Sequence, residues 1–186
     1  MATAPISRGQ VEQGGGDSPL PIGSRLPSLT SSAVGGRVQW RNLRAGGTAV
    51  IFLQGVEEGD ELDYITSLQA LAGEYGLWDG RVIAVVPGLD HSALDELETV
   101  SEEDSGPRIY PGAPGSVALV TEPQGEAERC GLRTGEIAIL IADRWGQIYH
   151  GARGSNIASL PEPAELTEWF RFLSMQCPEC GVIDEP

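Results

Sequence analysis

The chain has 186 residues, of which 40% are hydrophobic, and it carries 27 acidic against 12 basic residues. This length and composition predict one globular domain whose core is large enough to fold without disulfide staples. The net charge of -15 argues against nucleic acid and against an anionic membrane as partners, because both attract basic patches. The sequence contains no apolar run of the roughly 20 residues that cross a membrane and no export signal, so we expect a cytoplasmic protein.

Composition divides the chain into three parts. Residues 1–21 are rich in Gly, Ser, Pro and Gln, which is typical of a disordered tail. Residues 22–175 hold the periodic apolar stretches and form the predicted domain. Residues 176–186, "QCPECGVIDEP", form a C-terminal tail that contains a CxxC pair.

The first half of the domain predicts a strand, a helix and a second strand. A continuous run of β-branched and apolar residues predicts a strand over 48–55 that is buried on both faces, and a similar run predicts another over 81–88. Between them the apolar residues recur at helical spacing, with Asp60 as the expected cap and Gly76 as the expected end. Together these elements predict the βαβ unit of a parallel sheet.

The second half is irregular at first and regular at its end. Residues 116–121 predict a short strand, and residues 137–142 and 147–150 predict two strands joined by the turn "DRWG". Pro163 is expected to begin a last helix, since proline is favoured at the first helical position. Four apolar side chains line one face of that helix: Leu166, Trp169, Phe170 and Leu173.

This order of elements resembles that of the thioredoxin fold, and the details resemble the redoxin, peroxiredoxin-like branch. Three stretches carry the resemblance: the opening "IGSRLPSLTSSAVGGRVQWRNLRAGGTAVIFL", the hairpin "IAILIADRWGQIYH" and the closing helix "AELTEWFRFL". The resemblance covers residues 22–175 and implies an α/β protein with a thioredoxin-like fold, a central mixed β-sheet flanked by helices. A doubly wound α/β sheet is the alternative, and it needs more βαβ units than this chain supplies.

The sequence departs from this family at the position of the reactive cysteine. In the family that cysteine follows the first central strand, at a helix N-terminus, where backbone N–H groups stabilise a thiolate. Here the corresponding residues 53–65 read "LQGVEEGDELDYI" and contain no cysteine. The peroxide chemistry of the family therefore cannot be transferred to this position. Residues 134–137 also lack the proline that thioredoxins place before the late strand.

Cys177 and Cys180 are the candidate catalytic residues. Their CxxC spacing allows a disulfide within one turn, with Cys177 as the attacking thiol and Cys180 as the resolving thiol. The partner would be a protein thiol or disulfide. Glu179 and the C-terminal end of the preceding helix both disfavour a thiolate here, so a passive pair is the alternative.

A metal site is a further alternative for the CxxC pair. Four ligands are needed, and Cys130 with His150 would complete a set if the fold brought them to the pair, or a homodimer could pool two pairs. Taken alone, Cys130 is expected to be a small buried hydrophobe, and His150 a structural residue at the end of a strand. No phosphate-binding glycine loop is present, and we expect neither a metal nor a cofactor.

Two hypotheses for the function follow. The first is a peroxiredoxin-like redoxin with thiol–disulfide redox activity through Cys177 and Cys180. The second is a catalytically degenerate redoxin that serves as a binding or accessory subunit for an unidentified protein partner.

Overall fold

The structure is a computed structural model that describes residues 18–27, 30–33, 36–39, 46–55, 59–87, 114–121 and 126–176. Of the predicted N-terminal tail, residues 18–21 are described, and Leu20 packs against the core of the domain. The C-terminal tail is described only at Gln176, so Cys177 and Cys180 lie outside the described residues.

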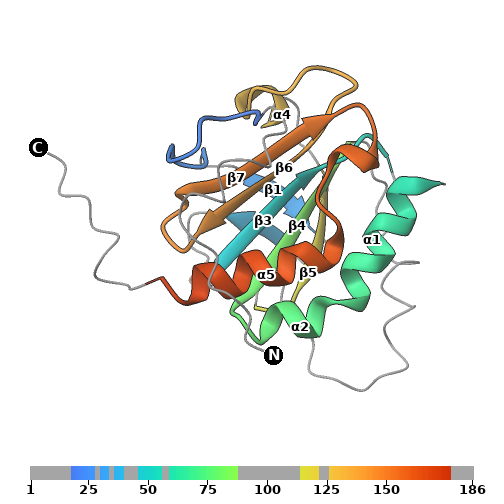
Figure 1. The fold of residues 1–186 in the computed structure, drawn as a ribbon. Coiled ribbons are helices and arrows are strands. Elements are labelled where there is room, and N and C mark those ends of the chain that lie inside the picture. Colours follow the sequence, from blue (N-terminus) through green and yellow to red (C-terminus); the bar gives the residue numbers. More distant parts are fainter. Residues whose placement is uncertain are drawn as a thin grey trace, which may run out of the picture.

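The strands form one mixed sheet in the order β2-β1-β5-β4-β3-β6-β7. Its strands are β1 (Thr30–Ala33), β2 (Gly36–Gln39), β3 (Gly47–Phe52), β4 (Gly80–Val86), β5 (Val117–Thr121), β6 (Ile137–Asp143) and β7 (Ile148–Gly154). β4 is parallel to β3 and to β5, whereas β6 is antiparallel to both β3 and β7. The helices are α1 (Asp60–Ala70), α2 (Ala72–Gly76), α4 (Glu126–Arg129), the short 3-10 helix η3 (Ile157–Ser159) and α5 (Pro163–Ser174). Figure 1 shows this sheet flanked by helices.

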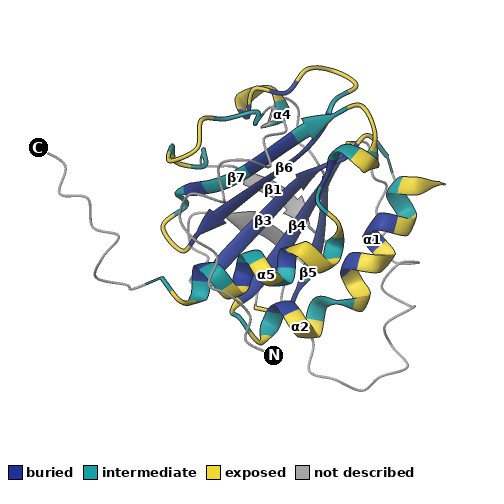
Figure 2. Cartoon of the chain, in the orientation of Figure 1, coloured by how far each residue is buried: buried dark blue, intermediate teal, exposed yellow. Residues whose placement is uncertain are grey.

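The two central strands confirm the prediction of a buried parallel pair. Every residue of β3 and of β4 is buried, and Val50 pairs with Ile83 in the middle of the ladder. Burial on both faces explains why these strands are continuously apolar, with no alternation of polar and apolar residues. Figure 2 shows them as the dark centre of the molecule.

The predicted single helix over 60–76 is in fact two helices, α1 and α2. At Leu71 the backbone N–H donates to the carbonyl of Leu68, three residues back, and this tight turn separates the helices. The prediction of Asp60 as the cap was also wrong by one residue. The cap is Gly59, whose φ of 92° is a left-handed conformation that glycine adopts without steric cost.

Two apolar clusters cover the two faces of the sheet. We call the face under α1, α2 and α5 the helical face and the other the opposite face. Buried on the helical face are, among others, Ile51, Ala84, Ile139, Ile65, Tyr75 and Phe170. Buried on the opposite face are, among others, Val50, Ile83, Leu140, Cys130 and Leu132, with Leu20 and Leu26 packed against them. Side chains of a strand alternate between the faces, so each residue of β3 and β4 has a known side.

Helix α5 lies across the N-terminal ends of the central strands, and two glycines permit its close approach. A Cβ atom at Gly80 would lie 2.3 Å from Cγ of Phe170, and one at Gly47 would lie 3.0 Å from Cδ1 of Leu173. The helix begins at Pro163, as predicted. Its second half is therefore fixed over the starts of β3 and β4.

The predicted hairpin is present, but its second strand is longer than expected. β7 continues to Gly154, whereas the sequence predicted an end at residue 150. Ile141 pairs with His150 and Ala142 with Ile148, so Tyr149 is an extra residue in a β-bulge. The bulge disrupts the alternation of apolar and polar residues from which a strand is recognised in sequence. Among the described helices, none has the length and apolarity to cross a membrane.

Candidate functional site

The loop after β3 is the position at which a reactive cysteine was sought in the sequence. There the Oε2 atom of Glu61 accepts hydrogen bonds from the backbone N–H groups of Gln54 and Gly55, both at 2.9 Å. These are the kind of backbone donors that stabilise an anion near a helix N-terminus. The chain's own carboxylate therefore occupies donors that could otherwise serve a thiolate or an anionic substrate.

A second loop closes this site from the side of β6. The Gln54 side-chain amide donates to the carbonyl oxygen of Gly135, so the end of β3 is tied to the loop before β6. In that loop the backbone N–H of Arg133 donates to Oε2 of Glu136 at 2.9 Å. The first turn of α1 adds Asp60 and Asp63 to Glu61. We call residues 54–55 and 59–63 with this loop the β3-end site. It is acidic, and the sequence places no thiol in it.

The structure describes the end of α5 as far as Gln176, the residue before Cys177 in the sequence. Gln176 is the last described residue, and its backbone N–H donates to the carbonyl of Leu173 at 3.2 Å. Its side-chain amide donates to the carbonyl of Phe172 at 3.4 Å. Cys177 is covalently attached to this ordered helix end. Met175, two residues before Cys177, is 64% exposed.

The C-terminal end of α5 and the β3-end site lie at opposite ends of the central strands. Leu173 contacts the sheet at Gly47, the first residue of β3, whereas Gln54 follows the last residue of that strand. Gln54 is seven positions after Gly47 along this extended chain, which corresponds to about 23 Å. Figure 1 shows the C-terminal end of α5 on the side of the molecule away from the start of α1.

Cys130 is buried in the core of the opposite face. Its exposed fraction is 0%, and it lies in one cluster with Leu132 and Val85. This confirms the prediction of a small buried hydrophobe. His150 is on the helical face, where it stacks on Trp169. Because the sheet separates the two residues, the metal site that would join Cys130 to His150 is excluded. Within the described part of the chain, no three His, Cys, Asp or Glu side chains form a group that could hold a metal ion.

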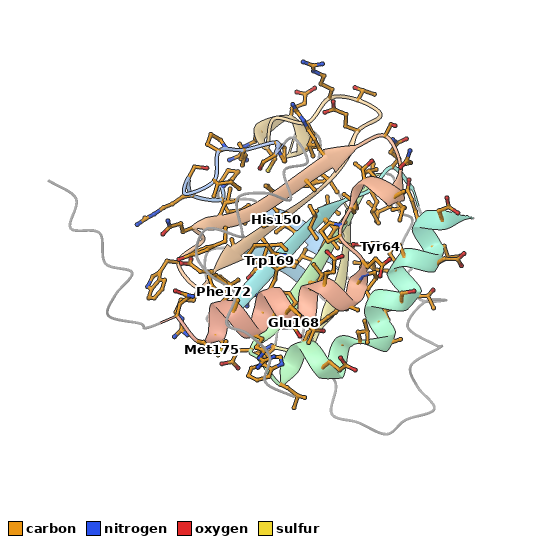
Figure 3. The ribbon with its side chains drawn as sticks, in the orientation of Figure 1. Tyr64, His150, Glu168, Trp169, Phe172 and Met175 are labelled. Carbon is orange, nitrogen blue, oxygen red and sulfur yellow. The ribbon has the colours of Figure 1, made fainter. Side chains whose placement is uncertain are left out.

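An aromatic cluster joins β7 to α5, and sequence reasoning missed it. The rings of His150 and Trp169 stack with centroids 4.8 Å apart. Phe172 contacts Trp169 edge-on at 6.1 Å and Tyr149 at 6.0 Å. Figure 3 shows His150, Trp169, Phe172 and Met175 following one another toward the end of α5. Burial lowers the pKa of His150 below 6.5, so its ring is neutral at neutral pH.

The β-bulge explains this cluster. Ile148 lies in the core of the opposite face, and regular alternation would place His150 there too. The extra residue Tyr149 shifts the alternation, so that both Tyr149 and His150 lie on the helical face. The spacing of Trp169 and Phe172, three residues apart on a helix, was the one signal of the cluster in the sequence.

Fold and topology together define a thioredoxin-like protein, and comparison with solved structures agrees. Thiol peroxidase from Chromobacterium violaceum is similar, with a TM-score of 0.61 and 16% identity over 87% of this chain and 91% of that one. Peroxidoxin BcpB from Mycobacterium tuberculosis gives 0.60 and 12%, over 82% and 95% of the two chains. A thiol:disulfide interchange protein from a Bacteroides species gives 0.53 and 15%, over 87% and 95%.

These likenesses establish the fold and nothing finer, because the identities are low. No protein-family model and no curated protein matches the sequence. The chain therefore has the thioredoxin-like fold that peroxiredoxins and thiol:disulfide interchange proteins share. The resemblance drawn from the sequence is confirmed at this level.

Proposed function

We propose that the protein carries out thiol–disulfide exchange with a protein substrate through Cys177 and Cys180. The distribution of its cysteines is the observation that carries the proposal. The sequence has three cysteines, and Cys130 is fully buried. The β3-end site has no thiol, and Glu61 occupies backbone donors there. Only the CxxC pair is left to perform the redox chemistry that accompanies this fold in its structural neighbours.

The exchange proceeds in two steps. The thiolate of Cys177 attacks one sulfur of the partner's disulfide, which forms a mixed disulfide and releases one partner thiolate that takes up a proton. The thiolate of Cys180 then attacks the sulfur of Cys177. This step forms the Cys177–Cys180 disulfide and releases the second partner thiol. Two electrons pass from the dithiol to the partner, which leaves reduced.

The position of α5 favours an external substrate over a role for the pair at the β3-end site. Cys180 is four positions after Gln176 in the sequence, and four residues of chain span at most about 14 Å. The β3-end site lies about 23 Å along the strand from the contact of α5 with Gly47. Met175 and Phe172 provide apolar surface at the end of α5, a few residues before the pair in the sequence, which suits a substrate with an apolar segment next to its disulfide.

A degenerate redoxin that acts as a binding or accessory subunit is the second candidate. The hydrogen bonds of Glu61 to Gln54 and Gly55 favour it, because they show a carboxylate held where the fold can stabilise a reacting anion. Under this hypothesis the CxxC pair packs or forms a passive disulfide, and no exchange occurs at a useful rate.

A thiol count separates the two candidates. Fully reduced full-length protein is mixed with insulin whose disulfides are intact, or with a slight excess of hydrogen peroxide. Free thiols are then alkylated at set times and counted by mass spectrometry on this protein alone, because exchange conserves the total number of thiols in the mixture. We expect rapid loss of two thiols with the protein disulfide, abolished by Cys177→Ser and unchanged by the control Cys130→Ala. Loss with peroxide as well would add peroxide reduction to the activity. Thiols that persist for hours with both oxidants would overturn the proposal in favour of the accessory subunit.

A further inference from the structure

A pocket lies on the opposite face of the sheet, at the N-terminal ends of the central strands. Its volume is about 470 Å³, and its lining includes Arg25, Thr48, Arg81, Asp143, Arg144 and Trp145. Thr48 on β3 pairs with Arg81 on β4. The next residues, Ala49 and Val82, lie on the helical face, so Thr48 and Arg81 lie on the opposite face. The pocket is therefore separated by the sheet from α5 and by the length of the strands from the β3-end site. Nothing in the proposed exchange reaction uses it.

A buried arginine, Arg81, is one of its lining residues. Arg81 is 2% exposed, and its Nε–H donates to the hydroxyl of Thr48 at 2.8 Å. Burial lowers the pKa of Arg81 to about 10, so the guanidinium still carries its charge at neutral pH. Its positive charge therefore lies in the wall of the pocket, where it favours an anion over a cation as the occupant.

The charges of the pocket are positive in a protein that is strongly negative. Its described lining residues include three arginines and one aspartate, a difference of two positive charges, whereas the chain carries -15. The carboxylate of this aspartate already accepts two hydrogen bonds. Oδ1 of Asp143 accepts hydrogen bonds from the backbone N–H groups of Trp145 and Gln147, both at 2.9 Å, and so closes the β6–β7 turn.

The rim is held in place by backbone contacts and carries an aromatic ring. Arg25 bridges to Gln147, and the N–H of Leu26 donates to the carbonyl of Gly146 at 2.8 Å, which fixes the N-terminal segment beside the turn. Arg144 lies over the ring of Trp145, with its guanidinium carbon 5.5 Å from the ring centroid. Trp145 is 43% exposed, so part of its ring faces solvent at the rim.

We propose that this pocket binds a small aromatic molecule that carries a phosphate or carboxylate group. The acidic group would be bound by the exposed guanidinium groups of Arg25 and Arg144, whose planar forks match both oxyanions. The ring of the ligand would stack on Trp145. The volume falls within the range of about 300–1,000 Å³ that is usual for small-molecule sites.

Isothermal titration calorimetry on the full-length protein at low salt tests the proposal. The probes are phenyl phosphate and benzoate, which distinguish the two acidic groups, and inorganic phosphate, which lacks the ring. We expect at least one aromatic probe to bind more tightly than inorganic phosphate. R144Q and R25Q should each weaken that probe about tenfold, the size expected for loss of one charged hydrogen-bond partner. W145A should weaken the aromatic probe and leave inorganic phosphate unchanged.

Arg133 offers a matched control, because it is exposed and lies before the opposite end of β6. R133Q removes the same charge and should change the affinity less than twofold. Arg25 and Arg144 are exposed, so their variants should keep the circular dichroism spectrum of the parent protein. Equal weakening by R133Q and R144Q would show non-specific attraction and overturn the proposal. The proposal would also be overturned if neither aromatic probe gave a heat of binding at concentrations up to about 10 mM. A Kd above about 10 mM is far weaker than ordinary ligand binding.

Discussion

The two ends of the central strands β3 and β4 differ in charge and in what their polar groups do. At the C-terminal end, Glu61 accepts hydrogen bonds from Gln54 and Gly55, and the surroundings are acidic. At the N-terminal end, Arg81 lines a basic pocket on one face, and α5 ends on the other at Ser174, three residues before Cys177. The strands are equally buried and apolar between the two ends. A thioredoxin-like sheet thus supports polar sites at either end, and the residues beyond the strands decide which end can carry chemistry.

The largest expected effect concerns the contact that holds α5 at the N-terminal end. Phe170 is fully buried, lies over Gly47 and Gly80, and contacts Tyr75 edge-on at 5.3 Å. Phe170→Ala should lower the free energy of unfolding by about 3–5 kcal/mol, because it removes a ring and leaves a cavity. Urea denaturation measures the change. Phe172→Ala, at a partly buried site, should cost only about 1–2 kcal/mol. Equal losses would contradict the placement of α5.

The next prediction concerns the carboxylate at the C-terminal end. Glu61→Ala should lower the free energy of unfolding by about 1–2 kcal/mol, because two backbone N–H groups lose a charged acceptor. Asp63→Ala is the matched control in the same helical turn. It removes a favourable interaction with the helix dipole only, worth about 0.5 kcal/mol. If both variants lost the same stability in urea denaturation, the hydrogen bonds of Glu61 would contribute nothing beyond the interaction of its charge with the helix dipole.

A smaller effect is expected where α1 is tied to the segment before α5. The hydroxyl of Tyr64 donates to the carbonyl of Pro161 at 2.8 Å, and Tyr64 is 6% exposed. Tyr64→Phe should cost about 1 kcal/mol, since the carbonyl loses its donor in a buried setting. Leu77→Ala, at a side chain that is 79% exposed, should change stability by less than about 0.5 kcal/mol. A thermal or urea transition unchanged by Tyr64→Phe would show that water replaces the lost bond.

The smallest effect is a pH dependence from His150 at the N-terminal end. Burial lowers its pKa in the folded state, so the unfolded state binds more protons as the pH falls through the usual value of 6.5. The stability that this group contributes is therefore complete above 6.5 and declines as the pH falls toward the lower folded pKa. His150→Gln should reduce the slope of stability against pH in this window. Titration of the His150 ring by NMR with a midpoint at or above 6.5 would contradict the prediction.

Much of the fold could be predicted from sequence because it rests on local patterns. The continuous apolar runs of β3 and β4 and the proline at the start of α5 identified these elements without a structure. The boundary errors have local causes as well. Gly59 replaces Asp60 as the cap of α1, and the turn at Leu71 divides a helix whose apolar spacing is nearly continuous. The bulge at Tyr149 hid the true length of β7.

The sites were much harder to predict, because they join residues that are distant in the chain. Arg25, Arg81 and Arg144 carry no shared motif, yet the pairing of β4, the β6–β7 turn and the N-terminal segment gathers them around one pocket. His150 and Trp169 are in contact only because the bulge in β7 places His150 on the face that α5 covers.

By itself, the sequence determined the class of fold, the absence of a thiol after the first central strand, and the presence of a CxxC pair next to the last helix. These features depend only on residue type and on the spacing of residues that are close in the chain, so they can be recognised in the sequence. Only the tertiary structure decided that Cys130 is buried, that Glu61 holds the loop after β3, and that α5 ends at the far end of the sheet from that loop. Burial and distance depend on how strands pair and how helices pack across them, and no local stretch of residues contains that information.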